Sequence, residues 1–125
     1  MRFLIDSHIV VWWCLFPERL RESTRQLLID PQNEILLSSA SIWELGIKIQ
    51  KGHLLLPADY AEKLLEDGMS SLHISFEHAR LAAALPSIHS DPFDRLLVAQ
   101  AITEGVSLMT VDRHIRRYDV PTIDP

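Results

Sequence analysis

Four acidic residues of this chain stand where an apolar segment ends or a helix is expected to begin. They are Asp6 after RFLI, Glu44 about one turn into the helix expected after EILLSS, Asp94 in DPFDRLLVAQA, and Asp112 after VSLMT. Carboxylates crowded at one place repel one another, and protonation or a cation relieves that repulsion. Because no cysteine stands near them, the oxygen ligands favour a hard divalent ion, Mg²⁺ or Mn²⁺. Such an ion polarises a phosphate oxygen and lowers the pKa of a bound water, which is the chemistry of phosphodiester hydrolysis.

Each acid taken singly also has a structural interpretation. Asp6 and Asp112 could cap the helices that follow them, and Glu44 precedes Lys48 by four residues, the spacing of a solvated helical pair. Asp91 fits an N-cap before a proline at N1, and Asp94 then falls at N3, the acidic arm of a capping box. Capping gives no reason, however, for a glutamate flanked by isoleucine, tryptophan and leucine. The joint pattern therefore favours a metal site over separate caps.

Six histidines are spread along the chain at spacings that match no metal-ligand motif. They are His8, His53, His73, His78, His89 and His114. His89 stands close to Asp91 in the sequence, but a surface histidine or one that orders the loop is the better interpretation. We assign no histidine a catalytic role.

The elements that must position these acids alternate between strands and helices. Short apolar runs predict strands at 2–5, 34–39 and 106–110, with weaker candidates at 71–75 and 120–123. Helical patterns are expected at 7–16, 18–30, 40–52, 58–68, 76–85 and 92–104, and a short helix or turn at 111–118. This alternation predicts an α/β fold with a mostly parallel central sheet of four to five strands. In such sheets the binding crevice lies at the carboxyl ends of the strands, where the four acids are placed.

Length, composition and net charge limit the class of protein to which this chain can belong. With 125 residues, 47% hydrophobic and 23% charged, the chain is expected to form a single domain, 1–125. No apolar run approaches the roughly 18 residues of a membrane span, so we expect no membrane contact and a cytoplasmic location. The single cysteine excludes an internal disulfide. A net charge of −5 argues against a protein that binds nucleic acid over its whole surface.

Four segments, in this order and spacing, resemble those of PIN-domain proteins, and specifically VapC-type toxins of type II toxin–antitoxin systems. They are FLIDSHIVVWW, SSASIWELGIKIQKGHL, DPFDRLLVAQAITEG and LMTVDRHIRRY. The resemblance spans nearly the whole chain. It implies a three-layer α/β/α PIN-like fold and an Mg²⁺-dependent endoribonuclease, with Mn²⁺ able to substitute, whose products carry 5′-phosphate and 3′-hydroxyl ends.

The resemblance also implies roles for individual residues. The catalytic, metal-binding acids would be Asp6, Glu44, Asp94 and Asp112, with Asp112 acting directly or through water. Supporting roles would fall to Ser7, Asp91 and Thr110. One or two Mg²⁺ ions would be held.

Several arginines close to these acids could contact the RNA backbone, although solvated surface arginines are the alternative. They are Arg95, Arg113, Arg116 and Arg117. Setting the four site acids aside changes the net charge from −5 to −1, so an anionic RNA substrate is compatible with the composition.

The resemblance further implies a cognate VapB-type antitoxin that covers the site, and a homodimer. Trp12, Trp13 and Trp43 could line the groove, with core packing as the alternative for each. Two other functions stay open: a non-catalytic PIN-like interaction module in which the acids only cap helices, and a phosphotransfer or phosphatase domain with Asp6 as its nucleophile.

Overall fold

The computed structural model describes residues 1–125, and strands and helices alternate along most of the chain. The elements are β1 (Arg2–Ile5), α1 (Ser7–Leu15), the 3₁₀ turn η1 (Pro17–Arg19), α2 (Glu22–Ile29), β2 (Glu34–Ser38), α3 (Ser39–Gln50), α4 (Tyr60–Glu66), β3 (Ser70–Leu72), α5 (Phe76–Ala84), α6 (Pro92–Glu104), β4 (Ser107–Met109), the 3₁₀ turn η2 (Ile115–Arg117) and β5 (Thr122–Ile123). Every strand and helix expected from the sequence is present. No helix is both long enough and apolar enough to cross a membrane.

The five strands form one sheet in the order β3-β2-β1-β4-β5, and all neighbours are parallel. β1 lies at the centre, where Leu4 pairs with Leu36 of β2 on one side and with Leu108 of β4 on the other. The expected sheet of four to five mostly parallel strands is therefore confirmed.

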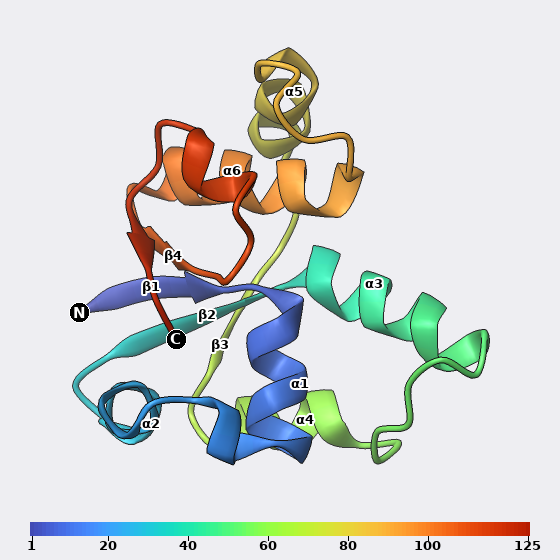
Figure 1. Cartoon of the computed structure of the whole chain (residues 1–125), viewed down its shortest axis with the longest axis vertical. Helices are drawn as coiled ribbons and strands as arrows, with labels where there is room; N and C mark the ends of the chain where they lie inside the picture. The colour runs from blue at the N-terminus through green and yellow to red at the C-terminus, as the bar shows by residue number, and fades with distance from the viewer.

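Side chains alternate between the two faces of the sheet, as the two-residue period of a strand requires. Phe3 and Ile5 pack with α1, α2 and α4 on one face, while Leu4 packs with α6 on the other. Figure 1 shows this arrangement, with α5 and α6 above the sheet and α1, α2 and α4 below it. Helices cover both faces of the sheet, which explains why the strand sequences are continuous apolar runs. The three-layer α/β/α fold is therefore confirmed.

Several element boundaries differ from the sequence prediction by a few residues, and two of these differences have a clear structural reason. The second helix was expected from 18, but Pro17–Arg19 forms a separate 3₁₀ turn and α2 begins at Glu22. Leu20, only 2% exposed, has an extended backbone between the two, so its burial interrupts the helix. The third strand was expected at 71–75, but it covers only Ser70–Leu72, since β3 is an edge strand with a single neighbour.

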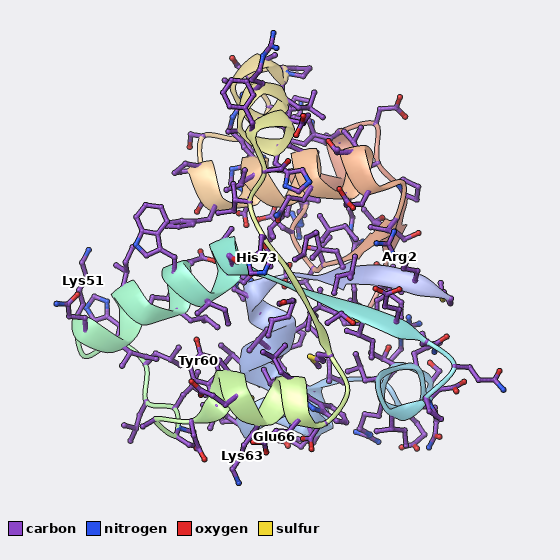
Figure 2. All side chains as sticks on the ribbon, turned by 180° about the vertical axis from the view of Figure 1, so that it is seen from behind. Arg2, Lys51, Tyr60, Lys63, Glu66 and His73 are labelled. Carbon is purple, nitrogen blue, oxygen red and sulfur yellow. The ribbon has the colours of Figure 1, made fainter.

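The carboxyl ends of the strands and the beginnings of α1, α3 and α6 meet at one side of the molecule (Figure 1). Only Asp6 separates β1 from α1, and β2 passes into α3 without any intervening residue. Seen from behind in Figure 2, Arg2 marks the opposite end of β1 and Lys51 the far end of α3. The fold therefore carries the predicted acids to a common edge.

Candidate active site

Asp6 leaves β1 at its carboxyl end and is 1% exposed. It caps α1, since its Oδ1 accepts a hydrogen bond from the backbone N–H of Ile9 at 3.2 Å, and the Thr110 hydroxyl also donates to its carboxylate. Burial raises the pKa of Asp6. These hydrogen bonds and the electrostatic effect of the nearby His8 lower the pKa, but they oppose the rise only in part. The predicted cap is thus real, but it does not compensate for burying the charge.

Thr110 joins Asp6 to Asp112. Its side chain is fully buried, and its Oγ1 accepts the backbone N–H of Asp112 at 3.0 Å. Asp112 Oδ1 in turn accepts the N–H groups of His114 at 2.7 Å and Ile115 at 3.1 Å. Burial acts to raise the pKa of Asp112, but these backbone bonds and the contact with His89 outweigh it and lower the pKa. Asp112 is therefore held as a carboxylate.

Glu44 lies on α3 with only 8% of its surface exposed. Its Oε2 is 3.9 Å from Lys48 Nζ, whereas its Oε1 is buried without any hydrogen-bond partner. Ser41, three residues earlier and so on the same helix face, also carries a buried hydroxyl with no partner. Ser41 was not among the residues predicted for the site, although its spacing from Glu44 was a usable signal. Two unpartnered oxygens on one helix face are the kind of group that a hydrated cation satisfies.

Asp91 and Asp94 open α6 and have different partners. Asp91 caps the helix, because its Oδ1 accepts the N–H groups of Phe93 at 2.8 Å and Asp94 at 3.1 Å. Burial, followed by the charges of Asp91, Glu44 and Asp112, raises the pKa of Asp94 to about 7. Asp94 thus lies close enough to Asp91, Glu44 and Asp112 to be repelled by each of them.

His89 occupies the position between Asp94 and Asp112. Its Nε2 is 2.9 Å from Asp94 Oδ2 and 3.2 Å from Asp112 Oδ2. Potential ligand atoms of these three residues lie within 4.8 Å of one another, which is compatible with metal binding. The sequence interpretation placed His89 near Asp91 as a loop residue and gave it no part in the site. Its position two residues before the N-cap of α6 was the one available signal.

The residues present fit a hard cation. Asp94 and Asp112 lie in one cluster with His89, the charge of Glu44 acts on Asp94, and Thr110 links Asp6 to Asp112. The unpartnered Oε1 of Glu44 is the observation that matters most, because a buried carboxylate oxygen without a donor is costly unless a cation accompanies it. Metal binding by these acids remains a prediction from the sequence that this geometry supports.

The expected supporting residues lie beside the acids. Ser7 is 2% exposed at the first turn of α1, next to Asp6, and Thr110 and Asp91 make the hydrogen bonds given above. Their support of catalysis stays a prediction.

Among the arginines, Arg95 is bound into the fold. Its guanidinium donates to the carbonyl oxygens of Ala82 at 2.7 Å, Pro86 at 2.9 Å and Leu85 at 3.0 Å. These bonds anchor the loop between α5 and α6 and leave few donors for RNA, so a structural role accounts for Arg95 better than the RNA contact expected of it.

The other three arginines lie near η2. Arg116 donates to the carbonyl oxygen of Thr110 at 3.1 Å and pairs with Asp124, while Arg113 and Arg117 are exposed. Contact with RNA remains a prediction for these three.

The tryptophans divide into two groups. Trp12 and Trp13 are half-buried and pack against the core, as the structural alternative predicted. Trp43 is 63% exposed, and its ring meets that of Phe93 edge to face at 5.2 Å, so core packing is wrong for Trp43.

A family model and a curated relative both match nearly the whole chain. A family model of the PIN domain matches residues 3–121. Ribonuclease VapC22 from Mycobacterium tuberculosis is 33% identical over 121 residues, which cover 94% of this chain and 92% of that protein.

Solved structures share the fold. VapBC2 from Rickettsia felis, bound to a promoter DNA fragment, gives a TM-score of 0.74 at 16% identity and covers 98% of both chains. A toxin–antitoxin complex from Klebsiella pneumoniae gives 0.67 at 20% identity, covering 97% of this chain and 95% of that one. VapBC-1 from nontypeable Haemophilus influenzae gives 0.65 at 17% identity, covering 99% and 98%. At these identities the likeness speaks to the fold alone.

Proposed function

The chain belongs to the PIN-domain family and is of the VapC type, and from this membership and the acidic centre we propose that it is a metal-dependent endoribonuclease. The observation that carries the proposal is the unpartnered, buried Oε1 of Glu44 in a cluster where Asp94 has a pKa of about 7. A non-catalytic fold would gain nothing from crowding carboxylates in this way, since the repulsion lowers its stability.

Asp6, Glu44 and Asp94 would hold Mg²⁺, with Mn²⁺ able to substitute, and Asp112 would take part directly or through water. When bound, the ion supplies Lewis acidity toward a phosphate oxygen and lowers the pKa of a water molecule. The chain itself orients the carboxylates. The hydroxyl of Thr110 donates to Asp6, and the backbone N–H groups of His114 and Ile115 hold Asp112 as an anion.

The substrate and partners are proposed from the family. Ribonuclease VapC22 supports RNA as the substrate, and the VapBC complexes among the structural relatives support a VapB-type antitoxin that covers the acidic edge. Exposed Arg113, next to Asp112 in the chain, and exposed Arg117, at the end of η2, are suited to contact phosphates of the RNA backbone. A homodimer is proposed from the family alone.

The decisive experiment is cleavage of a labelled RNA by purified protein with Mg²⁺ and with EDTA. We expect cleavage with Mg²⁺, none with EDTA, and products that carry 5′-phosphate and 3′-hydroxyl ends. Asp94→Asn should abolish turnover, while Asp59→Asn, which changes an exposed aspartate at the N-cap of α4 that makes no side-chain capping bond, should leave it intact. Cleavage by Asp94→Asn protein, purified apart from any wild-type chain, would refute the proposed site.

Stability provides a second, independent criterion. If the acids only capped helices, Asp6→Asn and Asp94→Asn would lower stability by about 0.5–2 kcal/mol, and Mg²⁺ would not raise the melting temperature. The metal centre predicts the opposite: Asp94→Asn stabilises the metal-free protein, and Mg²⁺ raises the melting temperature of the wild type by mass action.

A further inference from the structure

We propose that His89 is a positioning residue that fills the space between Asp94 and Asp112 with an N–H donor, so that the centre holds one metal ion rather than two. The inference rests on the proposed function and specifies the number of ions at the same site. It assigns a role to a residue that neither the acidic motifs nor the sequence interpretation included.

The hydrogen bonds of the ring determine where its proton lies. The backbone N–H of Asp91 donates to His89 Nδ1 at 3.3 Å, so Nδ1 is an acceptor and carries no hydrogen. The proton of the neutral ring is then on Nε2, which faces Asp94 Oδ2 and Asp112 Oδ2. A ring nitrogen that carries a hydrogen has no free lone pair for a metal. In this arrangement His89 donates to Asp112 Oδ2, lies against Asp94 Oδ2 at 2.9 Å, and is not a ligand.

The hydrogen bond from the Asp91 N–H to His89 Nδ1 also frees Asp94 from a helix-capping role. An acid at N3 of a helix ordinarily reaches back to the N–H of the N-cap residue in a capping box. In this chain His89 Nδ1 takes the N–H of the N-cap Asp91 instead. The Asp94 carboxylate is thereby released from capping and turned to the site, where its Oδ2 meets His89. The capping box, which was the structural alternative for Asp94, is therefore absent, and His89 is the reason.

The ring is held from the backbone as well as from its own nitrogens. The N–H of His89 donates to the Tyr118 hydroxyl at 2.9 Å, and that hydroxyl donates to the carbonyl of Pro86 at 3.0 Å. Arg95 donates to the carbonyl of His89 at 3.4 Å. The side chain of His89 is only 14% exposed. A ring restrained in this way is pre-organised, and it fixes the two carboxylates that it contacts.

The consequence concerns the number of ions. Two carboxylate oxygens that face one another would attract a cation, but here a donor already lies 2.9 Å from one and 3.2 Å from the other. His89 contacts Oδ2 of Asp94 and leaves its Oδ1 uncontacted, and the buried Oε1 of Glu44 has no hydrogen-bond partner. A single ion would use these oxygens, with His89 in place of a second ion.

The test counts Mn²⁺ ions bound to the metal-free protein by calorimetric titration and by electron paramagnetic resonance. Wild-type protein and His89→Gln, whose amide keeps a donor, should each bind one Mn²⁺. His89→Ala should bind a second Mn²⁺ in the vacated space, while the affinity for the first is retained. Asp94→Asn should lose binding. In parallel, the ¹⁵N shifts of the His89 ring in wild-type protein should show the Nε2–H tautomer both without and with saturating Mg²⁺.

Three results would overturn the inference while leaving a metal-dependent nuclease in place. They are two Mn²⁺ ions on the wild type, an unchanged ion count in folded His89→Ala, or transfer of the ring proton to Nδ1 when Mg²⁺ binds. A ligand role for His89 would instead weaken binding of the first ion by about 10–100-fold in His89→Ala, which also contradicts it. Absence of Mn²⁺ from the wild type would refute the proposed function itself. Should His89→Ala fail to fold, the wild-type ion count and the ring tautomer still decide the question.

Discussion

Lys48 Nζ lies 3.9 Å from Glu44 Oε2, one turn further along α3, and Glu44 Oε1 still has no partner. The helical ion pair that the four-residue spacing predicts is therefore present, but Lys48 approaches only one of the two carboxylate oxygens. A lysine whose side chain is 44% exposed compensates a buried carboxylate poorly, because solvent screens the pair. Oε2 of Glu44 therefore belongs to the ion pair with Lys48, whereas Oε1 is the oxygen available to the proposed metal site.

Glu44→Gln should abolish RNA cleavage while the metal-free protein becomes no less stable. The substitution removes a buried charge, and several kcal/mol of Lewis-acid stabilisation correspond to a rate loss of at least about 100-fold. Initial cleavage rates and urea unfolding in EDTA measure the two effects. Glu62→Gln, at an exposed glutamate of α4, is the matched control and should change neither. Normal cleavage by Glu44→Gln would remove Glu44 from the centre.

Metal-free protein should lose stability as the pH rises from about 4 to 7. The folded-state pKa of Asp94 is raised from 3.8 to about 7, so the folded state binds a proton that the unfolded state has released in this range. The stability is therefore greatest below the unfolded-state pKa and levels off above about 7. Melting temperatures in EDTA at several pH values measure this effect. The difference between wild type and Asp94→Asn isolates the contribution of this carboxyl, and a pH-independent difference would contradict the assignment.

Arg95→Ala should destabilise the fold by about 2–3 kcal/mol, as expected when several hydrogen bonds from a charged group to carbonyl acceptors are lost. The loop between α5 and α6 loses the donor to Ala82, Leu85 and Pro86. Arg113→Ala is the control: at an exposed position it should change stability by less than about 0.5 kcal/mol. Urea unfolding gives both values, and RNA affinity of the two folded variants then separates anchoring from phosphate contact. Equal stability of both variants would refute the structural role of Arg95.

Asp91→Ala should cost about 1 kcal/mol of stability, since the N-cap acceptor for Phe93 and Asp94 is removed. Asp91→Ser keeps an acceptor oxygen and should recover most of the loss. Removing the negative charge should also lower the pKa of Asp94, because Asp91 contributes to its elevation. Chemical denaturation and carboxyl ¹³C titration of the metal-free protein test the two statements. A pKa of Asp94 that does not fall in either variant would show that the charge of Asp91 is not part of its cause.

The order of the elements and the location of the acids were predictable because both depend on neighbouring residues. Apolar runs such as RFLI and EILLSS form strands that are covered on both faces, and Asp91 before a proline is a local capping signal. Parallel strands then bring their carboxyl ends to one edge, so Asp6, Glu44 and Asp112 could be placed together without coordinates.

What the sequence by itself determined was therefore the α/β fold, its parallel sheet and the set of acids at its carboxyl edge. Only the tertiary structure decided which side chains complete that edge, because such contacts join residues far apart in the chain. His89 contacts Asp112, 23 residues later, and Arg95 turns to the carbonyls of the preceding loop instead of to solvent. The direction of a side chain follows from packing and from the competition of donors for acceptors, and neither has a period that a sequence displays.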